Sequence, residues 1–239
     1  DESDSLSCIS IQNGIICPDG HLYDPSIQKH YTFNKWYHKP ITPQNYQINT
    51  TYKNEYLLSL IQIWNNFFQH VTFDTLPKLI GIIKLLELHD NIKIIVINHI
   101  QRNLLIQFGK IEPSKIIIRN NSTTYFKCKK TFYMNFINTT SKSVKLGSSG
   151  YNTISKYIPY TPTHSKKNIC YISRGKNTTR ILQNEQNIIN TLQDISKHYN
   201  HDFYHFENPK NIDELKNILI NCNLFISMHG GAMGNIIWC

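Results

Sequence analysis

Short runs of apolar residues alternate with longer amphipathic stretches in the second half of the chain. The runs at 168–174, 203–206 and 224–228 are mostly apolar, which is typical of strands buried in a sheet. Residues 184–199 and 212–221 lie between these runs and have the apolar spacing of helices. Strands that alternate with helices in this way usually form a parallel sheet. The pattern therefore predicts a β-α-β-α-β unit.

The middle of the chain shows the same alternation. Residues 79–88 form an amphipathic stretch that predicts a helix, and Pro77 would end or kink any helix before it. The short apolar runs at 93–97 and 115–119 predict strands, and residues 102–108 predict a helix between them. We therefore expect a second α/β layer in this region.

The remaining regions complete the predicted domain organisation. A further helix is predicted from Tyr56 onward, because the apolar residues there fall on one helical face. Residues 1–50 are rich in turn formers such as Pro18-Asp19-Gly20, and residues 120–168 are polar and irregular. The helix face consists of Leu57, Leu60, Ile61, Trp64 and Phe68. The predicted domains are a loop-rich segment with about two short strands at 1–50, a first lobe at 51–150, a linker at 151–167 and a second lobe at 168–239.

Composition narrows the function classes. A 239-residue chain with 40% hydrophobic residues can bury a core, and it should fold as a globular protein. The formal net charge of +9 predicts attraction to anions, but the lysines are scattered and no basic-aromatic motif for nucleic acid occurs. No apolar run reaches the roughly 20 residues that cross a bilayer. Because the chain begins at Asp1, we expect a processed or excised piece, with any membrane anchor upstream.

The six cysteines do not indicate a metal site. They include no CxxC pair, so we expect no zinc site. Cys8 and Cys17 lie nine residues apart beside turn residues. They would form a disulfide in an oxidising compartment, and otherwise all six cysteines are thiols. The sequence leaves both alternatives open.

A small-residue turn follows the last predicted strand. His229-Gly230-Gly231-Ala232 removes side-chain bulk where the backbone must turn or approach another molecule closely. Bare amide groups at the start of the next helix would form an anion site, most often for phosphate. The alternative is a plain turn in which the glycines only permit tight packing.

Polar residues also follow the other strands of the second lobe. In parallel sheets ligands bind beyond the carboxyl ends of the strands, which predicts one rim with Ser173-Arg174, Glu207 and the His229 turn. Arg174 can bind a phosphate through two parallel hydrogen bonds. A surface salt bridge between Arg174 and Glu185 is the open alternative.

His70 and Asp74 form the candidate catalytic pair of the first lobe. They are four residues apart, so on a helix the carboxylate lies one turn from the imidazole and can orient it. Such a pair can act as a general base or hold a substrate hydroxyl. A His–Asp contact that only joins two helices would look the same in sequence.

Three blocks in a fixed order give the chain a family resemblance. They are Asn66-Phe67-Phe68-Gln69-His70 through Asp74-Thr75-Leu76-Pro77-Lys78-Leu79, then Tyr171-Ile172-Ser173-Arg174 with Arg180-Ile181-Leu182-Gln183-Asn184-Glu185, then His229-Gly230-Gly231-Ala232-Met233-Gly234-Asn235. With these blocks the chain resembles glycosyltransferase family 61 over about residues 55–239. That family includes plant xylan arabinosyl- and xylosyltransferases, and animal transferases that add protein O-GlcNAc or extend O-mannose in the secretory pathway.

The resemblance implies a fold and an activity. It implies a GT-B-like α/β fold of two Rossmann-like lobes with parallel sheets, and inverting transfer of GlcNAc or a pentose from a nucleotide-diphosphate sugar, expected to be UDP-linked. The acceptor would be a hydroxyl of a protein or polysaccharide glycan, without an essential metal or other cofactor, in the Golgi or endoplasmic reticulum lumen. The family continues beyond the last block, so we expect the second lobe to be incomplete here.

The resemblance also implies residue roles. Arg174 would contact the diphosphate, Glu185 would support the strand–helix junction, and the His229 turn would cradle phosphate or sugar. His70 and Asp74 would lie near the acceptor and supply the base. The predicted donor-binding residues are Ser173, Arg174, Lys176, Arg180, Glu185, His229, Gly230, Gly231, Ala232 and Asn235.

Two rival functions stay open at this point. An inactive relative would bind nucleotide or glycan without transfer, and Gly234, which lacks the hydroxyl usual at this position of the family, favours that rival. Charge alone would also permit a nucleic-acid-binding protein. The motif order favours the glycosyltransferase, with no nucleic-acid partner.

Overall fold

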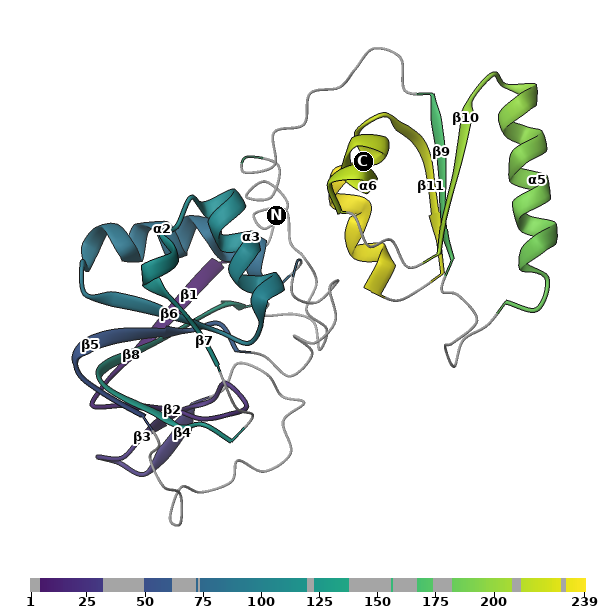
Figure 1. Cartoon of the computed structure of the whole chain (residues 1–239). Helices are drawn as coiled ribbons and strands as arrows, with labels where there is room; N and C mark the ends of the chain where they lie inside the picture. Colours follow the sequence, from purple (N-terminus) through teal and green to yellow (C-terminus); the bar gives the residue numbers. More distant parts are fainter. Residues whose placement is uncertain are drawn as a thin grey trace. The chain divides into compact units, whose positions relative to one another are not determined.

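The computed structural model divides the chain into two compact units, Asp1–Tyr157 and Ile158–Cys239 (Figure 1). Both units combine helices with sheets that contain parallel strands, which confirms the α/β class. The GT-B arrangement of two facing lobes stays a prediction. The residues that the structure describes are 5–31, 50–61, 72, 74–119, 123–137, 156, 167–173, 182–207, 212–228 and 231–239.

The first unit is built on an eight-stranded mixed sheet. The strands are β1 (Ser5–Gln12), β2 (Ile15–Ile16), β3 (Leu22–Asp24), β4 (Lys29–Tyr31), β5 (Thr50–Ser59), β6 (Ile92–Val96), β7 (Ile116–Ile118) and β8 (Phe126–Ile137). Their order is β4-β3-β2-β8-β5-β6-β7, and β1 also pairs with β8. The strands β8, β5, β6 and β7 are parallel, whereas β1 to β4 join antiparallel. The sheet is therefore mixed, and not wholly parallel as predicted.

Helices follow β5 and β6 in the chain. The 3-10 helix η2 (Leu76–Lys78) leads directly into α2 (Leu79–Leu88), and α3 (His99–Gly109) follows β6. The Asn98 side chain caps α3 by accepting a 2.9 Å hydrogen bond from the backbone N–H of Gln101. A second 3-10 helix, η3 (Pro113–Lys115), precedes β7. The predicted helices at 79–88 and 102–108 and the strands at 93–97 and 115–119 are confirmed.

The helix predicted from Tyr56 is wrong, because these residues form the strand β5. The strand lies between β6 and β8, and the neighbouring residues Leu57 and Leu58 are both fully buried. A strand that is covered on both faces loses the alternation of apolar and polar residues, so its sequence resembles a buried helix. Trp64 and Phe68 lie outside the described residues.

Two regions expected to be irregular contribute five strands to this sheet. β8 falls within the polar stretch 120–168, and β1 to β4 fall within the supposed loop-rich segment 1–50. β1 pairs with β8 from Ser5 opposite Ile137 to Gln12 opposite Lys130. Pairing between segments more than 100 residues apart cannot be recognised from the local sequence. The lysines of β8 also make this strand look polar in sequence, although one of its faces is buried. Residues 5–31 therefore belong to the first unit's sheet and not to a separate segment.

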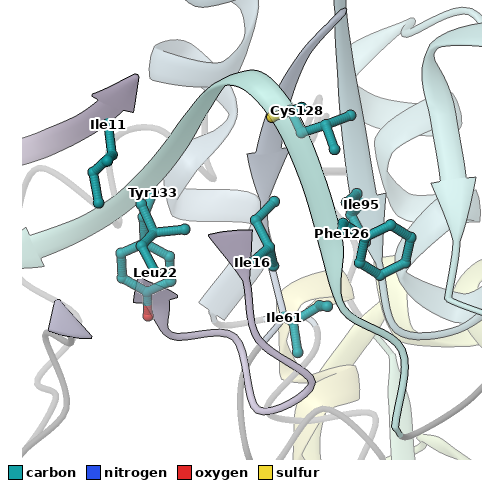
Figure 2. Packing of buried hydrophobic residues seen from close by; sticks show 9 residues of the cluster. Ile11, Ile16, Leu22, Ile61, Ile95, Phe126, Cys128 and Tyr133 are labelled. Atoms are coloured by element: carbon teal, nitrogen blue, oxygen red, sulfur yellow. The ribbon is translucent and has the colours of Figure 1, made fainter. Parts of the chain in front are cut away.

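The core of the first unit joins these early strands to the parallel ones (Figure 2). Side chains from six strands, or from the residues next to them, meet in one cluster, so the N-terminal strands are integral to this unit's packing. The cluster contains Ile11, Ile16, Leu22, Leu57, Ile61, Ile95, Phe126, Cys128 and Tyr133.

The second unit contains the predicted β-α-β-α-β run. Its elements are β9 (Asn168–Ser173), α5 (Glu185–His198), β10 (Asp202–Glu207), α6 (Ile212–Ile220), β11 (Cys222–Ser227) and the 3-10 helix η4 (Gly231–Trp238). The sheet is parallel in the order β10-β9-β11. The chain moves from β9 outward to β10 and then back past β9 to β11, so right-handed connections place α5 and α6 on opposite faces (Figure 1).

Two sequence expectations concern the compartment. All six cysteines are free thiols, so the structure has no disulfide between Cys8 and Cys17. Within the part of the chain that the structure describes, every helix is too short or too polar to cross a lipid bilayer.

Candidate functional site

The carboxyl ends of β9 and β11 form the candidate site of the second unit. These two strands are parallel neighbours, and Ile172 lies opposite Ser227. The first connection runs from β9 outward to β10, and the second returns from β10 past β9 to β11, so the direction of the connections reverses and the topological switch point lies between β9 and β11. Ligands of open α/β sheets bind at such a point, beyond the carboxyl ends of the strands. Ser173, the last residue of β9, is buried there.

Several predicted donor-binding residues lie outside the described residues. Arg174, Lys176, Arg180, His229 and Gly230 belong to this group, so their roles stay predictions. Arg174 is the residue after β9, and His229 comes two residues after β11. The two motifs therefore start from the ends of neighbouring parallel strands.

Glu185 has a partner that the sequence did not indicate. The Tyr171 hydroxyl donates a 2.6 Å hydrogen bond to Oε1 of Glu185, which joins β9 to the first residue of α5. Tyr171 is buried, and its ring stacks on His205 of β10 at 5.5 Å between centroids. Burial raises the pKa of Tyr171, and the Glu185 carboxylate raises it further. The phenol therefore keeps its proton and acts as a donor.

The third motif continues into η4. Gly231 and Ala232 begin this 3-10 helix, so the chain starts a helical segment where the sequence predicts one, although not an α-helix. Asn235 is buried within it. Lys216 of α6 places Nζ 5.3 Å from the ring centroid of Trp238, which fixes the end of η4 against α6.

The first unit has its own polar cluster at the carboxyl ends of β5 and β6. Gln101, which is almost fully buried, donates through Nε2 to Leu60 O and to Thr75 Oγ1, both at 3.0 Å. Its Oε1 accepts a 3.0 Å hydrogen bond from the backbone N–H of Ile97. One side chain thus joins the ends of two strands to the segment before α2. We call the residues that follow β5, β6 and β7, from Leu60, Ile97 and Arg119 onward, the carboxyl edge of the first unit.

Asp74 directly precedes Thr75 of this cluster, and its negative charge acts on Lys78. Lys78 is 2% exposed, and burial lowers its pKa to about 8, although the negative charge of Asp74 acts in the opposite direction. His70 lies outside the described residues, so the predicted pair of His70 and Asp74 stays untested. The sequence analysis missed Lys78 as a candidate, although its charge and its position four residues after Asp74 were the available signal.

A model of the Glycosyltransferase 61 family matches residues 68–239, well over half of the chain. The chain belongs to glycosyltransferase family 61. No curated protein matches the chain. The resemblance that the three sequence blocks indicated is thereby confirmed.

Membership makes this glycosyltransferase an enzyme that uses a sugar donor and a glycan or protein acceptor. Family 61 glycosyltransferases typically work in the secretory pathway. The match includes both His70 and Asp74 and the predicted donor motifs of the second unit. It leaves out β1 to β5, which complete the sheet of the first unit.

Proposed function

We propose that this family 61 glycosyltransferase moves GlcNAc or a pentose from a UDP-sugar to a hydroxyl of a protein or polysaccharide glycan, with inversion at the anomeric carbon. The observation that carries the proposal is the pairing of β9 with β11. These neighbouring strands end directly before the two predicted donor motifs, at the switch point where α/β sheets bind ligands. The proposed compartment is the Golgi or endoplasmic reticulum lumen.

On the donor side, positive groups stabilise the leaving diphosphate. Arg174 binds it through paired hydrogen bonds, and Lys176 and Arg180 add charge. The amides of the His229-Gly230-Gly231 turn supply further donors. The net charge of +9 is consistent with this role, because side-chain cations then replace a metal ion. Glu185, held by Tyr171, supports the junction of β9 and α5.

On the acceptor side, His70 with Asp74 removes the proton of the attacking hydroxyl. The acceptor oxygen attacks the anomeric carbon as the bond to the diphosphate breaks, which inverts the configuration. Asp74 orients the imidazole and stabilises its positive charge after proton transfer. The bond between Gln101 and Thr75 supports this step, because it anchors the residue after Asp74 to the strand ends.

Incubation of the chain with a panel of UDP-sugars and glycan acceptors tests the proposal, with the product anomer assigned by NMR. We expect an inverted linkage, transfer that persists in EDTA, and a large loss of rate in His70→Ala and Asp74→Asn. Asp194→Asn, a carboxylate substitution on α5, is the matched control. Unchanged rates in both His70→Ala and Asp74→Asn would contradict the assigned base. UDP binding without any transfer would favour the inactive relative instead.

A further inference from the structure

A tight turn between β2 and β3 is pressed against the carboxyl edge of the first unit. The backbone N–H of Gly20 donates to Cys17 O at 2.9 Å, and the N–H of Cys17 donates to His21 O at 2.8 Å. Gly20 has a φ of +91°, and a Cβ there would lie 2.2 Å from Ile61 O. Only glycine permits this approach, so the turn is fixed against the backbone that follows β5.

Arg119 joins the same turn to the end of β7. Its backbone N–H donates to Val96 O at 2.9 Å, and its guanidinium donates to Pro18 O. Since β5, β6 and β7 are parallel, the ends that the turn contacts lie at one edge of the sheet. Gln101 joins Thr75 to the same edge through its hydrogen bonds to Leu60 O and Thr75 Oγ1. The turn precedes residue 68, where the family match begins.

The Asp19 carboxylate of this turn is held by the buried residue His21. His21 Nδ1 and Asp19 Oδ2 are 2.7 Å apart, and the His21 backbone N–H donates to Asp19 Oδ1 at 3.2 Å. The His21 side chain is 2% exposed, whereas that of Asp19 is 40% exposed. Burial alone would raise the pKa of Asp19, but the hydrogen bonds from His21 outweigh it and lower that pKa. Asp19 therefore presents an oriented, ionised carboxylate at the protein surface.

Arg119 lies close enough to Asp19 for their charges to interact. Burial lowers the pKa of the half-buried Arg119, and the negative charge of Asp19 counteracts this effect. The ionised Asp19 carboxylate only accepts hydrogen bonds, and the nearby Arg119 guanidinium only donates them. A hydroxyl both donates and accepts hydrogen bonds, so it can bind to both groups in addition to their protein partners, whereas an anion would be repelled by Asp19 and a cation by Arg119.

We propose that Asp19 and Arg119 bind hydroxyl groups of a saccharide acceptor at the carboxyl edge of the first unit, with His21 as the positioning residue of Asp19. The inference rests on the proposed function, because it assigns the acceptor side of that reaction to this unit. It adds binding residues from a segment outside the family match. The location agrees with the general rule that ligands bind at the carboxyl ends of parallel strands.

Saturation-transfer NMR with xylohexaose, mannobiose and chitobiose tests the inference without requiring turnover. The full chain is compared with Asp19→Asn and Arg119→Lys, and UDP affinity is measured in parallel. Asp24→Asn is the matched control, because that carboxylate accepts hydrogen bonds from Ser26 in the neighbouring exposed turn. Thermal unfolding checks that each variant is folded. If Asp19→Asn is unstable, Arg119→Lys still tests the site, because it keeps the positive charge.

We expect the full chain and Asp24→Asn to bind one of the saccharides, and the two site variants to bind it at least about 10-fold more weakly with unchanged UDP affinity. Saccharide affinity within twofold of the parent in folded Asp19→Asn and Arg119→Lys would overturn the inference. Absence of saccharide binding by the full chain would overturn it as well. If the full chain binds a saccharide but does not bind UDP, only the donor side of the proposed function is overturned.

Discussion

Tyr171 and Glu185 are joined by a 2.6 Å hydrogen bond between β9 and the first residue of α5. The bond lies two residues before the end of β9, beside the strand end from which Arg174 follows. A carboxylate in the first turn of a helix also interacts favourably with the helix dipole. Both effects fix the strand–helix junction beside the predicted donor-binding residues, so Glu185 would act by holding this geometry.

Removal of the Tyr171 hydroxyl should therefore lower stability. Tyr171→Phe leaves a carboxylate without its buried donor, which typically costs about 1.5–3 kcal/mol of unfolding free energy. Urea unfolding of Tyr171→Phe, Glu185→Gln and the double variant measures the coupling. Tyr204→Phe on β10 is the matched control. Equal losses in Tyr171→Phe and Tyr204→Phe would show that the bond contributes nothing.

Replacement of the buried Gln101 side chain should strongly destabilise the first unit. Gln101→Leu removes hydrogen bonds to Leu60, Thr75 and Ile97 in a buried setting, so we expect a loss of about 2–4 kcal/mol in unfolding free energy. Gln186→Leu on α5 removes a 2.9 Å bond to Asn190 that is exposed, and it should cost less than about 0.5 kcal/mol. Chemical denaturation of both variants checks this difference. A small effect of Gln101→Leu would mean that the strand ends hold together without its side chain.

Lys78 predicts a pH dependence of stability. Its pKa is about 8 in the folded chain and near 10.5 when unfolded, so the unfolded chain binds more protons between these values. Stability then rises with pH across this window, by at most about 1.4 kcal/mol per pH unit. Below pH 8 the lysine is charged in both states, so the cost of burying its charge is fully present and stability does not depend on its titration. Unfolding of the parent and Lys78→Met from pH 7 to 10 measures the slope difference. Lys84→Met, which removes an exposed lysine of α2, is the control.

The sign of the difference in slope between the parent and Lys78→Met shows in which direction the fold shifts the pKa of Lys78. If the parent and Lys78→Met give parallel curves, Lys78 does not change its protonation between the folded and unfolded states. A parent curve that falls relative to Lys78→Met would indicate a pKa raised by Asp74 beyond the effect of burial.

The local pattern of apolar residues correctly predicted those helices and strands that pack against neighbouring elements of the sequence. α2, α3, α5 and α6 each show one apolar face to a sheet, and the short strands β6, β7 and β9 are mostly apolar runs. The pattern failed at β5, where burial on both faces removed the alternation. It failed again at β8 and β1, because their pairing joins the two ends of the first unit.

The candidate site shows the same limit. The family blocks predicted Asp74, Ser173 and Glu185 as site residues from sequence alone, because each block can be read along the chain without knowledge of the fold. The partners Tyr171 and Gln101 became visible only in the fold, since their bonds depend on packing across elements. The turn at Asp19 was recognised as a turn, but its contact with Ile61 and Arg119 was not predictable.

Calorimetric titration of UDP into the full chain and Arg174→Ala tests the central claim most directly. Lys197→Ala is the control, because this lysine lies in the last turn of α5, at the opposite end from Glu185. We predict that the parent and Lys197→Ala bind UDP alike and that Arg174→Ala binds at least about 10-fold more weakly, as expected for loss of a charged hydrogen-bonding pair. Equal UDP affinity in Arg174→Ala and the parent would contradict the assignment of the diphosphate to the carboxyl ends of β9 and β11.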